Sequence, residues 1–343
     1  MLLRIGVIGT GGIGKGHIRR ITDTIPNATV VAVNDINTKT VKAVAEEFGA
    51  RIETDPHKLI FSDDVDAIII ASWDPTHEEF CVSAIRAGKY VFCEKPLSDT
   101  SAGCRRIMDA EINGGKRLLQ VGFMRRYDKG YRQMREAISS GRIGNPLILH
   151  CQHRNLAPTG AKHTTEMSVN GALVHEFDIT RFLIGDDDPY ISAQLVYPRS
   201  TRYADKDLID PQLVYLETKN GVRIELEIFM NCQYGYDIQC EVVGEDGTVR
   251  LPDPANIIVK QAGECSYDIV PTWESRFSDA YEVQLREWVN GVLSDNITGP
   301  TAWDGYVTAV VAEACTKSRL TNSIVPIELG ECPEFYRHRE GSR

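Results

Sequence analysis

The sequence has no long apolar run and no basic tract. No apolar stretch approaches the roughly 20 residues that a membrane-spanning helix needs. The opening residues carry Arg4 inside a short apolar run, which is unlike a signal peptide. The formal net charge is −10, whereas binding to a phosphate backbone requires clustered lysine and arginine. We therefore expect no membrane partner, no nucleic-acid partner and a cytoplasmic location.

Several catalytic and structural motifs are also missing. The nine cysteines include no Cys-x-x-Cys pair, which favours reduced thiols over a disulfide framework. The eight histidines are dispersed without a His-Glu-x-x-His pattern, so no metal site is predicted. Neither the Gly-x-Ser-x-Gly elbow of hydrolases nor a Walker lysine motif occurs.

What is present is the pattern of a dinucleotide-binding unit. The branched apolar run Leu3 to Ile8 leads directly into the Gly-x-Gly-x-x-Gly motif formed by Gly9, Gly11 and Gly14, and a helical pattern follows. In such a motif the glycines permit a tight turn, a close approach of pyrophosphate, and close packing of helix on strand. The helix N-terminus offers unpaired N–H groups to the phosphates. The predicted contacts also include Gly12 and Ile13 within this loop.

The end of the second predicted strand, residues 29–33, supports the same interpretation. Asp35 follows it, at the distance where an acidic side chain accepts hydrogen bonds from the adenosine ribose. A carboxylate there repels the 2′-phosphate of NADP, and Asn37 and Thr38 provide no arginine to hold it. We therefore expect NAD as cofactor, with strong preference over NADP.

Strands and helices continue to alternate through the first third of the chain, which predicts a doubly wound parallel sheet. Its domain is expected to cover residues 1–122. The further predicted helices are 41–48, 78–87 and 101–113, and the further strands are 67–72, 90–93 and 118–121. Ligands bind beyond the carboxyl ends of such strands, which draws attention to Ser72, Trp73, His77, Glu94 and Lys95.

The remainder, residues 123–343, is expected to form a second domain. Runs at residues 147–151, 213–218, 222–230 and 238–243 predict strands, several of which alternate apolar and polar residues, as in a sheet with one solvated or interface face. Asp246-Gly247 indicates a hairpin. Helices are predicted at residues 131–140, 172–183, 283–293 and 301–319.

Two residues have the chemistry needed to oxidise a secondary alcohol, which requires a base for the hydroxyl proton and a donor for the developing alkoxide. Lys95 follows a strand end and is restrained by Pro96. His175 lies on a predicted amphipathic helix, three residues before Asp178 on the same face, and a neutral imidazole is a suitable base. His153, Asn155, Tyr234 and Tyr236 follow or flank predicted strands and are able to bind hydroxyl groups.

Together these residues resemble the Gfo/Idh/MocA oxidoreductases, and within them the branch that acts on inositols. The resemblance covers essentially the whole chain. Its most specific segments are Glu94-Lys95-Pro96, Arg125-Arg126-Tyr127-Asp128, His153-Arg154-Asn155, His175-Glu176-Phe177-Asp178, Gln233-Tyr234-Gly235-Tyr236-Asp237 and residues 299–306.

The resemblance implies roles for individual residues. Lys95 is the family's active-site lysine, which hydrogen-bonds the reacting hydroxyl, and His175 is the proton acceptor. His77 lies near the cofactor. A cyclitol pocket is lined by Met124, Arg125, His153, Asn155 and Tyr234, with Asp178 in support. The resemblance also implies a C-terminal α+β domain with a large, open, mainly antiparallel sheet, whose outer face mediates a homotetramer.

The sequence departs from the inositol branch at one position. Those enzymes often carry an aspartate four residues before the catalytic histidine, where this chain has Gly171, preceded by Asn170. Either Glu166 or Asp178 replaces that acid, or the pocket accepts a different stereoisomer. The expected reaction is NAD-dependent oxidation of a cyclitol, with myo-inositol first. The alternatives are scyllo-inositol, D-chiro-inositol, a pyranose sugar, or a non-catalytic NAD-binding sensor.

Overall fold

The computed structural model describes residues 2–156, 163–185, 187–253 and 257–337. The chain forms two compact units. The first unit comprises Met1–Phe123, Tyr281–Ala309 and Gly330–Arg343, and the second comprises Met124–Ala280 and Val310–Leu329. The predicted division at residue 122 lies beside the end of the first segment, but two later segments of the chain also belong to the first unit.

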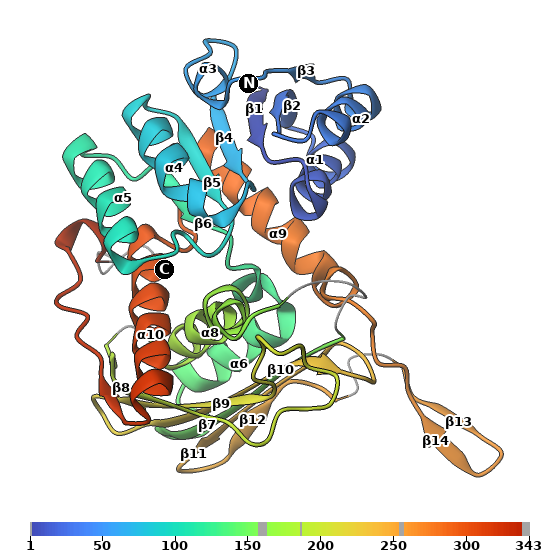
Figure 1. Cartoon of the computed structure of the whole chain (residues 1–343), viewed down its shortest axis with the longest axis vertical. Helices are drawn as coiled ribbons and strands as arrows, with labels where there is room; N and C mark the ends of the chain where they lie inside the picture. The colour runs from blue at the N-terminus through green and yellow to red at the C-terminus, as the bar shows by residue number, and fades with distance from the viewer. Residues whose placement is uncertain (1, 157–162, 186, 254–256, 338–343) are drawn as a thin grey trace. The chain divides into compact units, whose positions relative to one another are not determined.

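The first unit contains a parallel sheet of six strands in the order β3-β2-β1-β4-β5-β6 (Figure 1). The sheet order changes direction between β1 and β4, which is the switch point where doubly wound folds bind ligands. Apolar branched residues dominate the central strands, and all four residues of β4 are fully buried, as in a sheet covered on both faces. The strands are β1 (Leu3–Ile8), β2 (Ala28–Asn34), β3 (Arg51–Ile52), β4 (Ala67–Ile70), β5 (Tyr90–Cys93) and β6 (Leu119–Val121).

The helices between these strands are α1 (Gly12–Thr24), α2 (Thr38–Phe48), α3 (Pro56–Ile60), α4 (His77–Arg86) and α5 (Ser101–Gly114). The predicted doubly wound sheet is therefore confirmed. The sequence interpretation had missed β3 and α3. β3 has two residues, both exposed, so it carries no periodicity to detect. α3 does have a detectable start, because Asp55 caps it and Pro56 occupies its first turn.

Late parts of the chain complete the hydrophobic core of the first unit. Helix α9 (Trp273–Leu293) passes from the second unit into the first and has a kink at Phe277. Its Trp288 is fully buried, and the indole meets the Phe92 ring edge-on at 5.6 Å between centroids. Nearer the C-terminus, the Tyr336 hydroxyl donates to the buried Glu111 of α5 at 2.8 Å.

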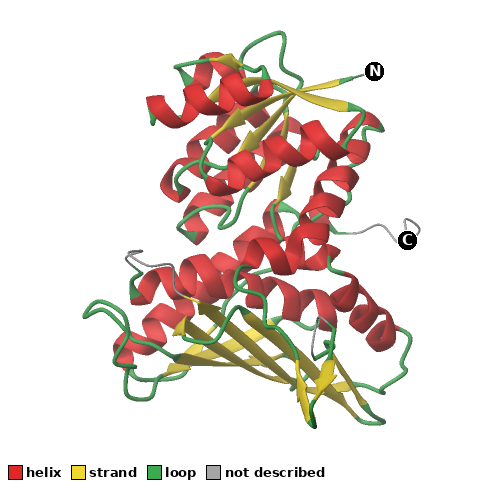
Figure 2. Cartoon of the chain, turned by 90° about the vertical axis from the view of Figure 1, so that its right-hand side faces the viewer, coloured by secondary structure: helices red, strands yellow, loops and turns green. Residues whose placement is uncertain are grey.

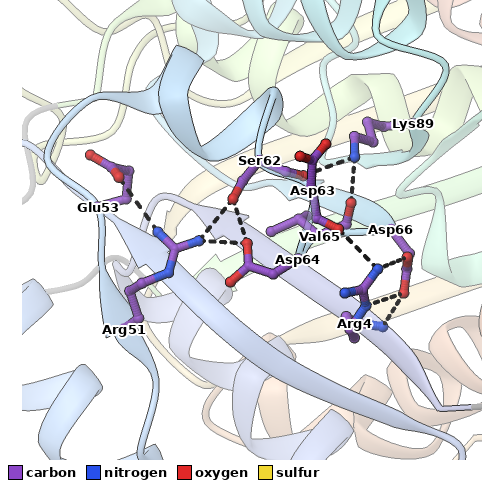
Figure 3. A network of polar contacts seen from close by, with 9 residues as sticks. All are labelled: Arg4, Arg51, Glu53, Ser62, Asp63, Asp64, Val65, Asp66 and Lys89. Atoms are coloured by element: carbon purple, nitrogen blue, oxygen red, sulfur yellow. Dashed lines mark hydrogen bonds and ion pairs between the residues drawn. The ribbon is translucent and has the colours of Figure 1, made fainter.

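Charged groups cluster at the amino ends of the strands, the edge opposite the ligand-binding edge (Figure 3). Arg4 at the start of β1 pairs with Asp66, which immediately precedes β4. Arg51 at the start of β3 donates to Asp64, and Lys89 before β5 donates to the carbonyls of Ser62 and Val65. Since these ion pairs are partly exposed, each adds little stability, and their position indicates a structural role.

The second unit is built on a seven-stranded sheet in the order β12-β11-β7-β10-β9-β8-β15. β7 and β10 pair in parallel, and every other pair is antiparallel, which confirms the expected mainly antiparallel sheet. The strands are β7 (Pro146–Leu156), β8 (Tyr190–Val196), β9 (Gln212–Thr218), β10 (Arg223–Cys232), β11 (Asp237–Gly244), β12 (Thr248–Arg250) and β15 (Val325–Pro326). The predicted hairpin at Asp246-Gly247 joins β11 to β12.

Helices cover one face of this sheet, and the other face is bare (Figure 2). They include α6 (Lys129–Ser139), α8 (Val174–Ile184) and the later part of α10 (Ala302–Thr321). Alternation along β10 produces the two faces: Ile224, Leu226 and Ile228 are buried, whereas Arg223, Glu225 and Glu227 lie on the other side. A separate two-stranded hairpin, β13 (Val259–Gln261) with β14 (Glu264–Ser266), projects from the second unit (Figure 1).

The helix expected at residues 172–183 has a different beginning. A short helix, α7 (Thr165–Met167), is followed by a π-helical turn at Ser168–Leu173, and α8 begins only at Val174. A π turn carries one more residue per hydrogen-bonded ring than an α-helix. The four-residue spacing between Gly171 and His175 therefore does not place the two residues as it would in a regular α-helix.

We predict that Trp288→Ala lowers the free energy of unfolding of the first unit by about 3–5 kcal/mol, because it leaves a cavity beside Phe92 in the core. Trp288→Phe is the matched control. It keeps a ring at this position and removes an indole N–H that is buried with no hydrogen-bond partner in the described structure. Chemical denaturation of the two variants is expected to show a smaller loss for phenylalanine. Equal losses would contradict the packing argument.

Candidate functional site

The glycine loop has the geometry that a bound pyrophosphate requires. Gly9 has a positive φ of 95°, and a Cβ there would lie 2.3 Å from the carbonyl oxygen of Ala71. A Cβ on Gly14 would lie 2.0 Å from the carbonyl oxygen of Gly9, so the helix approaches the loop at van der Waals distance. At Gly11 and Gly12 a Cβ would meet no atom within 4 Å, which leaves the backbone open to a ligand. No side chain caps the start of α1, so its first N–H groups remain available.

Asp35 lies directly beside this loop, at the carboxyl end of β2. Its Oδ2 accepts hydrogen bonds from the backbone N–H of Thr10 at 2.6 Å and from the Thr10 hydroxyl at 2.9 Å. Its Oδ1 accepts from the N–H of Asn37 at 2.8 Å, and Asn37 in turn caps α2. The carboxylate is thus fixed in orientation and keeps acceptor capacity for ribose hydroxyls.

The segment after β4 presents a flat aromatic surface. Trp73 is 73% exposed, and the turn beneath it is held by a 2.7 Å contact between the Ser72 and Thr76 hydroxyls. His77, by contrast, is buried. Its Nδ1 lies 2.8 Å from the carbonyl of Pro96 and its Nε2 lies 3.2 Å from the carbonyl of Ser72. His77 therefore connects the segments that follow β4 and β5, and its contact with the Pro96 carbonyl steadies the Lys95-Pro96 turn.

Glu94 and Lys95 follow β5, and the Lys95–Pro96 peptide bond is cis. Glu94 is buried, and one of its oxygens accepts the backbone N–H of Lys95 at 3.2 Å. The other oxygen lies 2.7 Å from Nε2 of His17 on α1. Gly122, at the end of β6, lies so close that a Cβ would be 3.1 Å from the Glu94 carboxylate. The His17 side chain of α1, the Glu94 carboxylate after β5 and the Gly122 backbone after β6 thus define the position of the lysine backbone.

In the second unit, Arg125, Glu176 and His153 form a buried ionic network. The Arg125 guanidinium donates to Oε1 of Glu176, and Nδ1 of His153 lies 2.9 Å from Oε2 of the same carboxylate. The side chains of all three are 3% exposed or less. The edge of the Tyr236 ring packs against His153 at 5.8 Å.

The network determines the charge of its members. Burial by itself raises the pKa of Glu176, but the nearby Arg125 and His153 outweigh burial and hold the pKa below its ordinary value. The carboxylate is therefore ionised at neutral pH and keeps Arg125 protonated despite complete burial. When Nδ1 of His153 donates to Glu176, its Nε2 becomes an acceptor, which suits recognition of a hydroxyl group.

Both acids considered as replacements at position 171 are paired with arginines. Asp178 receives Arg126 in a two-point ion pair at 2.9 Å and 2.5 Å, and its side chain is 1% exposed. Glu166 pairs with Arg319 at 2.5 Å. Asp178 therefore anchors α8 to Arg126. His175 is the second residue of the same helix and is 7% exposed.

The remaining predicted pocket residues do not all lie on one face of the sheet. Met124 is buried beside Arg125 in a 3-10 turn. Asn155 donates its side-chain N–H to the sulfur of Met230 at 3.2 Å. Tyr234 is 48% exposed, and its hydroxyl accepts from Arg154 and donates to Asp237, both at 2.7 Å. Since Arg154 and His153 point to opposite faces of β7, the structure joins Tyr236, not Tyr234, to the His153 network.

Two kinds of feature are not found in the described ranges. No group of three or more His, Cys, Asp or Glu side chains there is arranged to hold a metal ion. No helix among those residues is both long and apolar enough to cross a membrane.

Two family models match the chain. Residues 3–123 match the oxidoreductase family's NAD-binding Rossmann fold, and residues 135–329 match its C-terminal α/β domain. The chain belongs to the Gfo/Idh/MocA oxidoreductase family. This membership confirms the predicted oxidoreductase, and with the glycine loop and Asp35 in place it confirms NAD as the cofactor.

Similar proteins extend over nearly the full length. The chain is 51% identical over 339 residues to the inositol 2-dehydrogenase of Burkholderia cenocepacia, covering 98% of this chain and 100% of that protein. It is 51% identical over 338 residues to the inositol 2-dehydrogenase of Azotobacter vinelandii, with 98% and 99% covered. The crystal structure of myo-inositol dehydrogenase from Lactobacillus casei, in complex with NAD(H) and myo-inositol, superposes with a TM-score of 0.94 at 36% identity, covering 98% of this chain and 100% of that one.

Sequence reasoning missed two residues that organise the site. Glu176 was visible beside His175, but its role depends on Arg125 and His153, which are distant in sequence. His17 lies three residues after Gly14 in a helix, where a single histidine carries no specific signal. Their contacts arise only from tertiary packing.

We predict that a methyl group added at Gly11 weakens NAD binding, whereas one added at Gly14 destabilises the fold. Gly11→Ala is expected to leave the unfolding temperature of the apo protein nearly unchanged and to raise the Kd for NAD by about tenfold or more, because the methyl group occupies the open approach for pyrophosphate. Gly14→Ala is expected to destabilise the apo protein by about 1–3 kcal/mol through its clash with Gly9. Calorimetry and NAD titration measure both. Equal loss of stability in the two variants would contradict the assignment.

Proposed function

We propose that this protein is an NAD-dependent dehydrogenase that oxidises a secondary hydroxyl group of myo-inositol to the ketone, 2-keto-myo-inositol. The proposal is carried by one observation: an intact NAD loop and the Glu94-Lys95-Pro96 turn occur in one chain with His175 and the buried Arg125–Glu176–His153 network. The similarity to inositol 2-dehydrogenases over 98% of the chain supports the choice of substrate.

Bound NAD supplies the hydride acceptor for this reaction. In our proposal Lys95 donates a hydrogen bond to the reacting hydroxyl oxygen and stabilises the developing alkoxide. His175 accepts the hydroxyl proton at a ring nitrogen. Glu94 and His77 hold the backbone on either side of Lys95, so the ammonium group starts from a fixed point. A neutral polyol is recognised through hydrogen bonds to its hydroxyl groups and needs no opposite charge in the pocket. The proposed pocket residues provide such hydrogen bonds.

The residues that we propose for the substrate pocket belong to the second unit. Arg125 and Glu176 neutralise each other, and the network orients His153 for a substrate hydroxyl. Met124 supplies an apolar surface for the ring C–H groups, and Asn155 supplies an amide. Asp178 acts indirectly, since its carboxylate is occupied by Arg126 and fixes the helix that carries His175. Tyr234 remains a candidate contact at the rim.

For the cofactor we propose contacts with Gly9, Gly11, Gly12, Ile13 and Gly14 at the pyrophosphate and with Asp35 at the adenosine ribose. Ile36, which follows Asp35, is 97% exposed and offers an apolar face for adenine. The other proposed cofactor contacts follow two neighbouring strands. Ser72, the exposed Trp73 and His77 come after β4, and Glu94 and Lys95 come after β5.

A second candidate substrate is another inositol stereoisomer, scyllo-inositol or D-chiro-inositol. Gly171 is the observation that favours it. The two acids considered as substitutes for the usual aspartate, Glu166 and Asp178, each pair with an arginine. Asn170, in the same π turn, is the neighbouring polar side chain. A pocket with an amide or no side chain at this point recognises a different pattern of hydroxyl groups.

We also propose a homotetramer in the cytoplasm, acting in inositol catabolism. The bare face of the second unit's sheet supports the assembly, because it exposes apolar side chains beside a shallow groove, among them Ile148, Tyr215 and Ile324. The cysteines support a reducing compartment, since all nine are free thiols.

The test is NADH formation with myo-inositol, scyllo-inositol, D-chiro-inositol and D-glucose, for wild type and for Lys95→Ala. We expect the highest kcat/KM with myo-inositol, and a loss of at least about 100-fold in kcat for Lys95→Ala, because the variant removes the donor to the alkoxide. Lys89→Ala is the control, since that lysine is at the opposite edge of the sheet. If NAD binds and no polyol reacts, a non-catalytic NAD sensor replaces this proposal.

Gly171→Asp tests how substrate choice is determined. A Cβ at this position would meet no atom within 4 Å, so we expect the variant to fold with an unfolding temperature within about 3 °C of wild type. A carboxylate that reaches a substrate hydroxyl should change the ratio of kcat/KM between myo- and scyllo-inositol by about tenfold. Gly171→Ala makes the same backbone change without the carboxylate. An identical ratio in all three proteins would show that this position does not contact substrate.

A further inference from the structure

His17 is a buried histidine that the proposed reaction does not use. It lies on α1, the helix whose N-terminus faces the pyrophosphate loop, and it is 0% exposed. Its ring packs against Phe92 of β5 at 5.4 Å and against Tyr281 at 5.9 Å. The one polar atom of the described structure that its ring meets is Oε1 of Glu94, 2.7 Å from Nε2.

The tautomer of His17 follows from this environment. A proton on Nε2 lets the ring donate to the Glu94 carboxylate. Nδ1 is buried with no hydrogen-bond partner among the described residues, so a second proton there would have no acceptor. The ring therefore donates through Nε2 to the Glu94 carboxylate, which brings a buried negative charge to this place.

Glu94 depends on His17 for this charge. Burial by itself raises the pKa of Glu94, and the interactions with His17 and with Lys95 outweigh it, so the pKa stays below its ordinary value. The side of the carboxylate toward Gly122 provides no donor side chain, because a Cβ there would already be 3.1 Å away. His17 is consequently the side chain that fixes both the orientation and the ionisation of Glu94.

We propose that His17 is a positioning residue for the active site: it holds Glu94 as a buried carboxylate, and through Glu94 it couples the pyrophosphate-binding helix α1 to the Lys95 turn. Two direct contacts form the connection, from His17 Nε2 to Glu94 Oε1 and from Lys95 N–H to Glu94 Oε2. Occupation of the glycine loop and placement of Lys95 are thereby parts of one rigid arrangement.

The buried carboxylate has a second consequence. Glu94 lies at the carboxyl end of β5, on the ligand-binding edge of the sheet. NAD carries a positive nicotinamide ring when oxidised and a neutral ring when reduced. A buried carboxylate on this edge favours the oxidised form, because electrostatic attraction is strong where water is excluded. His17 therefore acts on the relative affinity for NAD and NADH.

The experiment compares His17→Gln with His17→Asn. Glutamine places its amide nitrogen near the position of the histidine Nε2 and can donate to Glu94, whereas asparagine is one methylene too short. The two variants share an amide and the same loss of the ring, so their difference isolates the hydrogen bond. His57→Asn is the control, because His57 makes a similar contact to Glu79 at 2.8 Å on the exposed surface of the same unit.

The readout is the Kd for NAD and for NADH, measured by titration calorimetry without any polyol. The inference rests on the NAD-binding role alone, so failure to oxidise an inositol would leave this test intact. We expect His17→Asn to weaken NAD by about tenfold more than NADH, and His17→Gln and His57→Asn to remain near wild type. In a Glu94→Gln background, His17→Asn should no longer change the ratio of the two Kd values.

The pH dependence gives an independent readout. Without a donor from residue 17, burial dominates and the pKa of Glu94 rises, so the preference for NAD over NADH should disappear at a higher pH in His17→Asn than in wild type. Equal effects of asparagine and glutamine, an unchanged Kd ratio, or an unchanged pH profile would each overturn the proposal. If His17→Asn does not fold, Glu94→Gln alone decides the question, because an NAD to NADH Kd ratio equal to that of wild type would show that the buried carboxylate has no such effect.

Discussion

A carboxylate buried in a protein needs a donor that is also buried, and both units of this chain meet that requirement directly beside a residue proposed for catalysis. Glu94 precedes Lys95 and is held by His17. Glu176 follows His175 and is held by Arg125 and His153. Breaking such a pair leaves an uncompensated charge, which costs more than the pair itself contributes. Each residue proposed for the chemistry is therefore attached to a backbone position that is difficult to move.

The remaining architecture brings the donors to these carboxylates. In the first unit, α1 must approach β1 closely enough for His17 to reach the end of β5. That approach is possible because Gly14 lies against the carbonyl of Gly9, where no side chain fits. In the second unit, a 3-10 turn, a strand and a helix supply Arg125, His153 and Glu176, so the network closes only when all three elements pack together.

The polar groups outside these networks have other roles. The ion pairs of Arg4 and Arg51 at the amino ends of β1 and β3 are partly exposed (Figure 3). They lie at the edge of the sheet opposite the cofactor loop. Asp178 and Glu166 each pair with an arginine, which explains how α8 and the turn before it are held. Both acids are therefore already paired with arginines, and the segment that carries Gly171 is a π turn in place of a regular α-helix.

Local patterns were sufficient to predict the cofactor loop and the central strands of the first unit. The branched apolar strands, the glycine motif and Asp35 occur in a fixed order, and each has a physical reason that depends on nearby residues. The strand alternation of the second unit was equally visible, because one face of its sheet is buried and the other is not. What periodicity did not reveal were β3, which has only two residues, and the π turn, whose extra residue leaves the apolar pattern almost unchanged.

The sequence by itself determined the family, the NAD-binding loop, and Lys95 and His175 as the candidates for catalysis, since these depend on short motifs whose chemistry is local. Only the tertiary structure decided which side chains support them. Tyr236, and not Tyr234, lies beside His153, Asp178 pairs with Arg126, and the carboxylates next to Lys95 and His175 are held by His17 and by Arg125 and His153. Contacts between residues 77 or 51 positions apart depend on how helices and strands pack, and no local pattern encodes that packing.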